Sequence, residues 1–205
     1  MAVMMECAGS GRAHLAPRPV SAPWHDEAIG CAEWTGTPLR GGMASVKWLR
    51  SITAIAEPFE GVQQTLLYRY RRSDEEPGTP VTRKKPRALM APPGMREFLS
   101  RIRHVRAGRT LIEGRAWSGP ATVCRVEFSA DGGRTWDDGR LEEPNGRHGW
   151  RAWSCDWDAG EAGDYELCVR ATDTAGNAQP LDSAETWNLG GYGVNAVQRV
   201  PVRVT

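Results

Sequence analysis

The chain has 205 residues, and its 26 Lys and Arg side chains against 25 Asp and Glu leave a formal net charge of +1. A chain of this length buries roughly 70% of its unfolded surface, which suffices for one ordinary domain or two small ones. The near-zero charge gives no global field toward nucleic acid or an acidic membrane. No apolar run approaches the roughly 18 residues that span a bilayer, and the N-terminal stretch lacks a signal-peptide pattern. As written, the sequence predicts a cytoplasmic chain.

The cysteines number five, with no C-x-x-C spacing: Cys7, Cys31, Cys124, Cys155 and Cys168. An odd count without that spacing argues against a complete disulfide framework and against a structural zinc site. Nine Trp beside three Phe are unusual, because a buried indole must find a partner for its N–H. This usage favours a β-rich core or a pocket lined by rings.

The N-terminal half is mixed in pattern. Short apolar runs broken by Pro and Gly occupy residues 1–60, where only 44–55 is long and apolar enough for a buried strand. From 68 to 106 the chain is dense in charge, Pro and Gly, which favours turns and extended backbone. We expect a mixed α+β part at 1–75 and a connector at 76–95.

The C-terminal part, 96–205, alternates with a period of two. The expected strands are 110–118, 122–129, 150–157, 164–172 and 197–204. In the second of them, Cys124, Val126 and Phe128 share one face. Asp131-Gly132-Gly133 supplies the positive-φ positions of a tight hairpin turn.

Short strands at regular spacing predict an antiparallel β-sandwich. The run Gly163-Asp164-Tyr165-x-Leu167 resembles the tyrosine corner of immunoglobulin-like domains, in which the phenol bonds back to nearby backbone. Pro201 requires an edge or bulge position in the last strand. The fold class is thus mainly β, with a smaller α+β part, and such a sandwich alone does not indicate a chemistry.

Cys7 is the first candidate functional residue. It begins the hexapeptide CAGSGR, where small neighbours leave space at the sulfur and Arg12 could lower the thiol pKa or bind an anion. Taken alone, a lone cysteine here is better explained by a buried, inert thiol. A cysteine hydrolase using Cys7 with His14 or His25 has the right residue types, but nothing nearby indicates an oxyanion hole.

Five segments carry a specific resemblance. CAGSGR, APW, AEWTGTPLR, GMASVKWL and the pair ATDTAGNAQP and WNLGGYGVNAVQRVPV stand in one order along nearly the whole chain. Together they resemble the molybdopterin-dependent oxidoreductases of the sulfite oxidase family. The resemblance implies a partial mixed α+β cofactor domain followed by an immunoglobulin-like dimerisation domain.

The resemblance also implies roles for single residues. Cys7 corresponds to the sole protein ligand of molybdenum, a soft thiolate donor, and Arg12 to the arginine that faces an oxyanion substrate. Trp24 corresponds to a ring that walls the substrate pocket. Tyr68, placed by its spacing, corresponds to the pocket tyrosine.

The same resemblance places the cofactor's polar edge. The pterin-contacting tripeptide corresponds to Ser45, Val46 and Lys47, where backbone groups and a point charge would hold the pterin or its phosphate. The implied cofactor is molybdenum-molybdopterin, and no haem motif is present in this sequence.

The sequence departs from the family at several places. It starts directly at the strand before the CAG motif, and Arg40 is followed at once by Gly41, so we expect a truncated and internally deleted cofactor domain. Ser10 stands where the family's CAGN motif commonly has Asn. The arginine of the WNLRG motif of sulfite oxidases is Gly190, which weakens the expected anion pocket.

Two functions of different class follow. The first is an oxidoreductase acting on sulfite or another small substrate, passing electrons to an external acceptor and forming a homodimer through its C-terminal domain. The alternative is a non-catalytic remnant whose sandwich serves only dimerisation. Nucleic-acid binding by the basic stretch 83–106 lacks interleaved aromatic residues, so we expect no nucleic-acid partner. A missing N-terminal segment would leave a periplasmic location open as the alternative.

Overall fold

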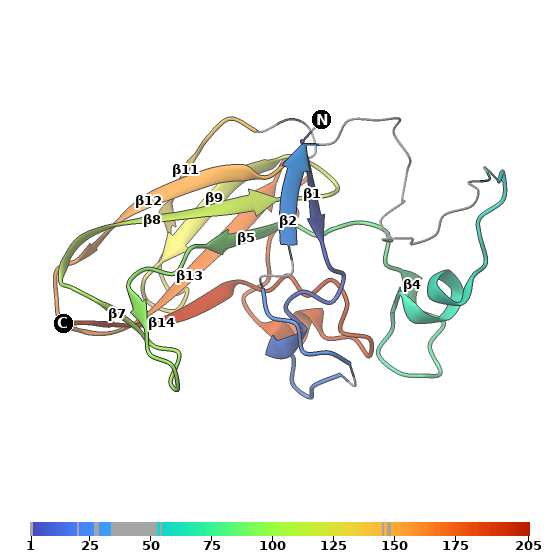
Figure 1. The fold of residues 1–205 in the computed structure, drawn as a ribbon, viewed down its shortest axis with the longest axis horizontal. Coiled ribbons are helices and arrows are strands. Elements are labelled where there is room, and N and C mark those ends of the chain that lie inside the picture. Colours follow the sequence, from blue (N-terminus) through green and yellow to red (C-terminus); the bar gives the residue numbers. More distant parts are fainter. Residues whose placement is uncertain are drawn as a thin grey trace.

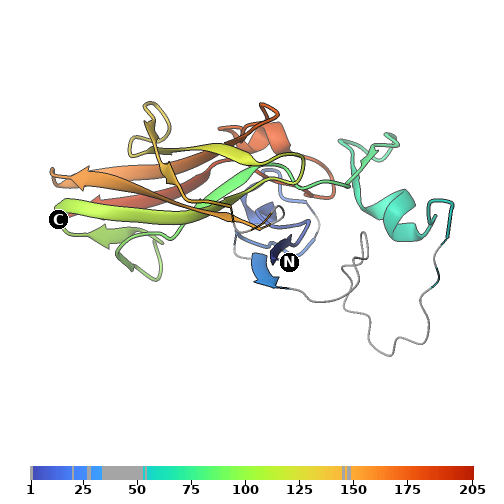
Figure 2. The same ribbon diagram turned by 90° about the horizontal axis from the view of Figure 1, so that it is seen from above.

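The computed structural model describes residues 2–19, 21–26, 29–33, 53, 55–144, 146 and 149–205. Two stacked sheets form an elongated sandwich that contains the C-terminus, and a short N-terminal hairpin stands against one end of it (Figures 1 and 2). Among the described helices, none is long and apolar enough to cross a membrane.

The larger sheet has six strands in the order β10-β9-β13-β14-β7-β6. Their bounds are Asp137–Asp138, Val123–Ser129, Gly163–Asp173, Gln198–Val204, Arg103–Val105 and Met95–Arg96. All pairs are antiparallel except β14 with β7, which run parallel through three register pairs. A short turn, 183–186, forms the 3-10 helix η3 before β14.

The smaller sheet has four antiparallel strands in the order β11-β12-β8-β5. These strands are Arg140–Leu141, Arg151–Ala159, Gly108–Trp117 and Arg87–Met90. β5 lies inside the segment 76–95 that the sequence suggests as a connector. Its residues Ala88 and Met90 are buried and pair with β8. The sequence did not indicate this strand, because charged residues and a proline stand beside it.

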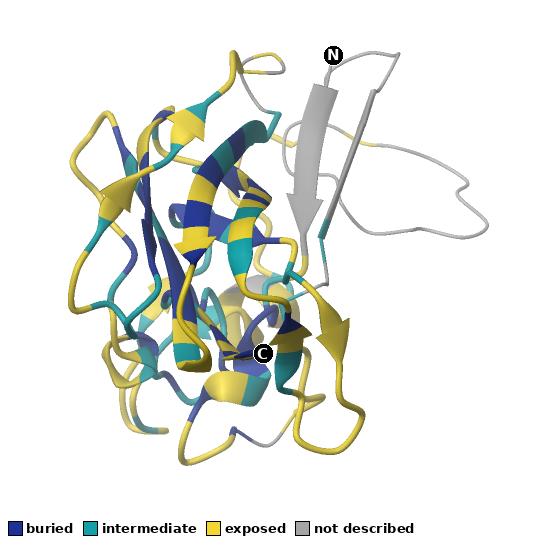
Figure 3. Ribbon diagram, turned by 90° about the vertical axis from the view of Figure 1, so that its left-hand side faces the viewer, coloured by how far each residue is buried: buried dark blue, intermediate teal, exposed yellow. Residues whose placement is uncertain are grey.

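The core lies between the two sheets, on the strand faces that Figure 3 shows as buried. Trp153, Cys155 and Trp157 of β12 point inward together, as their alternation predicts. From β13, Leu167, Val169 and Ala171 are fully buried against them. The period-two pattern therefore gave the inner faces of both strands correctly.

One expected face is wrong. Cys124 is exposed, whereas Val123 is buried with Val126 and Phe128. The register explains the difference, because Asp173 pairs with Val123 while Thr172 pairs with Arg125, so Cys124 is an extra residue in a β-bulge. A bulge shifts the alternation by one position, which a strict period of two does not anticipate.

Three local predictions are confirmed. The Tyr165 hydroxyl donates to the Glu161 carbonyl over 3.0 Å, the contact expected of a tyrosine corner. Gly132 and Gly133 have φ of 75° and 90° in the hairpin between β9 and β10. Pro201 lies in the part of β14 that β7 does not reach, so one side of the strand is an edge there.

The N-terminal part consists of short elements. β1 (Ala2–Glu6) and β2 (Ile29–Glu33) form an antiparallel hairpin, and the 3-10 turn η1 (Arg12–His14) lies between them in sequence. Farther along the chain, the π-helical turn η2 (Gln63–Leu67) precedes β3 (Arg69–Tyr70), which pairs with β4 (Thr79–Pro80). The strand expected over 44–55 lies outside the described residues except at its end, where Ile55 is 57% exposed.

Candidate functional site

The Cys7 turn follows directly from strand β1. The Ser10 N–H donates to the Cys7 carbonyl over 3.0 Å, and the Gly11 N–H donates to His25 over 2.9 Å. Gly11 has a φ of 81°, a backbone conformation that favours glycine. This tight turn leaves the Cys7 side chain exposed and directs the chain into η1.

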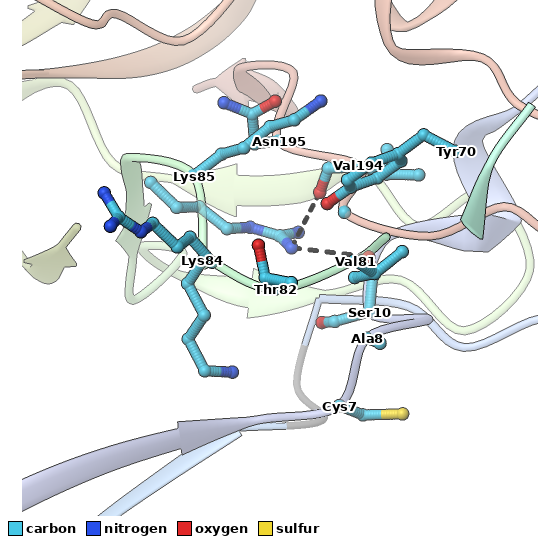
Figure 4. Close-up of a pocket in the computed structure, with 13 residues that line it drawn as sticks. Cys7, Ala8, Ser10, Tyr70, Val81, Thr82, Lys84, Lys85, Val194 and Asn195 are labelled. Carbon is cyan, nitrogen blue, oxygen red and sulfur yellow. Dashed lines mark hydrogen bonds between the residues drawn. The ribbon is translucent and has the colours of Figure 1, made fainter. Parts of the chain in front are cut away.

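A cavity of about 200 Å³ adjoins this turn. Figure 4 shows it between the Cys7 turn, the segment 81–87 and the loop 193–195. Its thirteen lining residues include four cationic side chains and no carboxylate, the cations being Arg83, Lys84, Lys85 and Arg87. The Lys85 ammonium lies 4.9 Å from the centre of the Tyr70 ring, and burial lowers its pKa. The cavity is therefore positive in character and suits an anion.

Arg12 is a buried cation beside the same turn. It is 5% exposed, and its Nη1 donates to the Ser21 hydroxyl over 2.6 Å and to the Ala22 carbonyl over 3.1 Å. Its Nε donates to the Gly191 carbonyl over 3.3 Å. Within the described ranges Arg12 forms no ion pair, so only neutral groups stabilise its charge. A buried guanidinium that faces no carboxylate is a strong hydrogen-bond donor to an anion.

Tyr192 joins the site from the C-terminal loop, and sequence reasoning missed it. Its ring lies 5.3 Å from the Arg12 guanidinium carbon and 4.9 Å from the Tyr68 ring, measured to its centre. Burial, and then the neighbouring Tyr68 phenol, raise the pKa of Tyr192 against the opposing charges of Arg12 and Arg71. The only signal available in the sequence was an aromatic residue within the glycine-rich run WNLGGYG.

A buried network of charged side chains contacts the Cys7 turn. The Asp26 carboxylate contacts a guanidinium nitrogen of Arg87, and its other oxygen lies 3.0 Å from His14 Nε2. Arg87 also donates to the Val194 carbonyl over 3.0 Å and to the Ser10 carbonyl over 3.4 Å. Because Arg87 begins β5, this network ties the Cys7 turn to the edge of the sandwich.

The other expected site residues are placed unequally. Tyr68 is 43% exposed and stacks on Tyr192, so the structure brings it to Arg12 through that ring. Trp24 is 51% exposed on the loop after η1, where its carbonyl accepts the Ala13 N–H over 3.0 Å. The tripeptide expected to contact the pterin, Ser45, Val46 and Lys47, lies outside the described residues, as does the Arg40–Gly41 junction.

Accessibility separates the thiols whose side chains the structure describes. Burial raises the pKa of Cys155, and it raises the pKa of Cys168 to about 11. Both thiols are therefore protonated and inert near neutral pH. Cys7 and Cys124 are exposed, and of these two only Cys7 lies at the positive cavity.

Comparisons with known proteins find matches for both parts of the chain. Residues 89–205 match the Mo-co oxidoreductase dimerisation domain, and residues 1–41 match the oxidoreductase molybdopterin binding domain. Mitochondrial sulfite oxidase of Drosophila melanogaster is 31% identical over 185 residues, covering 80% of this chain and 31% of the relative. Human mitochondrial sulfite oxidase is 40% identical over 108 residues, covering 49% of this chain and 20% of the relative.

A solved structure shares the fold. The sulfane dehydrogenase SoxCD from Paracoccus pantotrophus aligns with a TM-score of 0.58 and 24% identity, over 70% of this chain and 36% of that one. The chain thus contains parts of two domains that are typical of molybdenum-cofactor oxidoreductases. The chain belongs to the sulfite oxidase family, and it contains that family's dimerisation domain. It spans less than a third of the length of the fly and human relatives.

Proposed function

We propose that this chain acts in a molybdenum-cofactor oxidoreductase that oxidises sulfite or another small oxyanion. The observation that carries the proposal is the placement of one exposed thiol, Cys7, at the rim of a cavity whose described lining residues include four cations and no carboxylate. A thiolate is a soft donor that suits a transition metal passing between oxidation states. The donor chemistry at Cys7 and the charge of the cavity therefore fit the implied cofactor.

The chain's own residues would divide the work. Cys7 would hold the metal, and the cavity cations would attract the negative groups of the cofactor and the substrate. Arg12 would bind the substrate oxyanion through Nη2, because its Nε and Nη1 already donate to neutral groups and its charge meets no carboxylate among the described residues. When bound, the cofactor supplies oxygen-atom transfer between water and substrate, and the electrons leave to an external acceptor.

Molybdenum content tests this proposal directly. The full chain is expressed in a host that makes the cofactor, and molybdenum and pterin are measured per chain for the wild type, Cys7→Ser and Cys124→Ser. Cys124 is the matched control, since its thiol is also exposed but lies on the sandwich. We expect metal in the wild type and in Cys124→Ser, with a loss of at least tenfold in Cys7→Ser. Equal metal in all three chains, or none in the wild type, contradicts the proposal.

A second candidate function is assembly alone. Among the residues that the structure describes, eighteen buried side chains form one hydrophobic cluster in the sandwich, and none of these precedes Ala88. We propose that this part joins two copies of the chain, whether or not the cofactor binds. Sedimentation equilibrium of the full chain without cofactor tests this function. A dimer without molybdenum shows that assembly does not need the cofactor, and a monomer at micromolar concentration excludes this function.

A further inference from the structure

The ring of Tyr192 occupies a volume that a side chain at position 190 would need. A Cβ built on Gly190 would lie 2.3 Å from Cε2 and 2.6 Å from Cδ2 of that ring. Real Cβ atoms do not approach other atoms so closely, so any larger residue at 190 must displace the ring. The bare backbone of Gly190 and the ring of Tyr192 therefore form one packing unit.

Arg12 is held in a slot built from two further glycines. A Cβ on Gly9 would lie 2.6 Å from Arg12 Nη2, and one on Gly191 would lie 2.7 Å from Arg12 Cγ. Gly191 also has a φ of 61°. The slot fits the guanidinium closely on both sides, and the Tyr192 ring lies 5.3 Å from its central carbon. An aromatic ring at this distance attracts a cation, most strongly where water is excluded.

We propose that Tyr192 is a positioning residue for Arg12, and that its ring holds the guanidinium where it can bind an anion. Its ring packs over the bare backbone of Gly190 and lies beside the Arg12 guanidinium, which it holds in place. This inference rests on the proposed function only in taking Arg12 as the substrate-binding cation.

The ring carries this role, and the hydroxyl does not. Within the described part of the chain the Tyr192 hydroxyl makes no hydrogen bond, whereas the ring contacts both Arg12 and Tyr68. Tyr192→Phe keeps those ring contacts, and Tyr192→Leu removes them. The two variants therefore separate positioning by the ring from any effect of the phenol.

Sulfate is the probe, because it is a stable tetrahedral oxyanion. Its affinity for the full chain without cofactor is measured by calorimetry at low ionic strength. We expect Tyr192→Phe to bind within about twofold of the wild type and Tyr192→Leu to bind roughly tenfold more weakly. Trp136→Leu is the matched control, since the Trp136 ring lies 4.4 Å from Arg170 on the sandwich. It removes a comparable contact outside the site and should leave sulfate affinity unchanged.

Two further variants keep the test decisive. Gly190→Ala drives a Cβ into the ring and should weaken sulfate binding in the same direction as Tyr192→Leu, even if the latter folds poorly. Arg12→Lys keeps the charge but loses the fork, and it should also weaken binding. The loss of one nuclear magnetic resonance signal in Arg12→Lys also identifies the Arg12 Nε–H. That signal should shift in Tyr192→Leu and remain in place in Tyr192→Phe.

The outcomes are separable. Unchanged sulfate affinity in Tyr192→Leu, an equal loss in Trp136→Leu, or no effect of Arg12→Lys overturns the inference. A structural role alone would lower the unfolding midpoint of Tyr192→Leu without changing the affinity of the folded chain. Molybdenum content stands apart from this pattern, so the proposed function can fail while the sulfate pattern holds, and the reverse.

Discussion

The carboxylate of Asp26 and the guanidinium of Arg87 form a nearly buried ion pair that joins the N-terminal loop to the first strand of the sandwich. Their side chains are 15% and 4% exposed. Arg87 also donates to carbonyls of the Cys7 turn and of the loop before β14. One guanidinium thus links three segments that are distant in sequence. The position of the Cys7 turn on the sandwich depends on this pair.

Asp26→Asn should destabilise the fold. Removing one partner of a buried ion pair leaves an uncompensated charge, which costs about 3 kcal/mol. Urea unfolding followed by tryptophan fluorescence measures the change. Asp164→Asn is the control, since Asp164 pairs with Arg203 over 2.7 Å at the exposed surface and its loss should leave the midpoint unchanged. Equal midpoints for both variants would show that the Asp26 pair adds nothing.

Acid should weaken the same contact. Burial tends to raise the pKa of Asp26, but the His14 hydrogen bond and the charges of Arg87, His14 and His25 outweigh burial and lower it below 3.8. Because the folded pKa lies below the unfolded one, the stabilisation is present above pH 3.8 and is lost as pH falls toward the folded pKa. Other carboxylates also titrate there, Asp173 among them. The informative quantity is the difference in unfolding free energy between wild type and Asp26→Asn, which should shrink from pH 6 to pH 3.

The sandwich could be predicted because its strands alternate with one buried face. The period of two predicts that Trp153 and Leu167 face the core, and the local motif around Tyr165 predicts the tyrosine corner. Strand β5 was not predicted, because its buried Ala88 and Met90 stand within a charged, proline-rich stretch. The bulge at Cys124 could not be predicted, because it arises from the register of β9 with β13, which no local sequence pattern encodes.

The site was predictable only where a motif encodes it. Cys7 and Arg12 stand in one hexapeptide, so their proximity follows from the chain itself. Tyr192 reaches Arg12 across 180 residues through the packing of a glycine-rich loop, a relation that sequence separation conceals. The Asp26–Arg87 pair is hidden for the same reason, since each residue alone reads as a surface charge.

Tyr165→Phe should cost about 1 kcal/mol, the typical net contribution of one intramolecular hydrogen bond. It removes the bond to the Glu161 carbonyl and keeps the ring, whose centre lies 5.4 Å from that of Trp157. Tyr165→Leu should cost more, because it also removes this edge-to-face contact. Thermal unfolding of the two variants checks the order. If Phe and Leu are equally harmful, the hydroxyl accounts for the whole effect and the ring contact contributes none.

Gln179→Leu should be the most harmful substitution of a neutral polar residue in the sandwich. The Gln179 side chain is 3% exposed and lies between the sheets. Its oxygen accepts the N–H groups of Ala88 over 2.6 Å and Ala171 over 2.9 Å. Its nitrogen donates to the carbonyls of Asn195 over 3.0 Å and Ala196 over 3.2 Å. Leucine has a similar volume but would leave all four backbone groups without this partner.

Each buried backbone group left unpaired costs about 1–3 kcal/mol, so even partial relaxation leaves a loss of several kcal/mol for Gln179→Leu. Gln198→Leu is the comparison, since Gln198 is less buried and, within the described part of the chain, its side chain forms hydrogen bonds with just the N–H and carbonyl of Met90. Hydrogen exchange should report the difference locally, with the Ala88 and Ala171 amides losing protection in Gln179→Leu and the Met90 amide in Gln198→Leu. Retained protection at Ala88 and Ala171 in Gln179→Leu would mean that water replaces the amide, and the two sheets would then be held together by apolar packing alone.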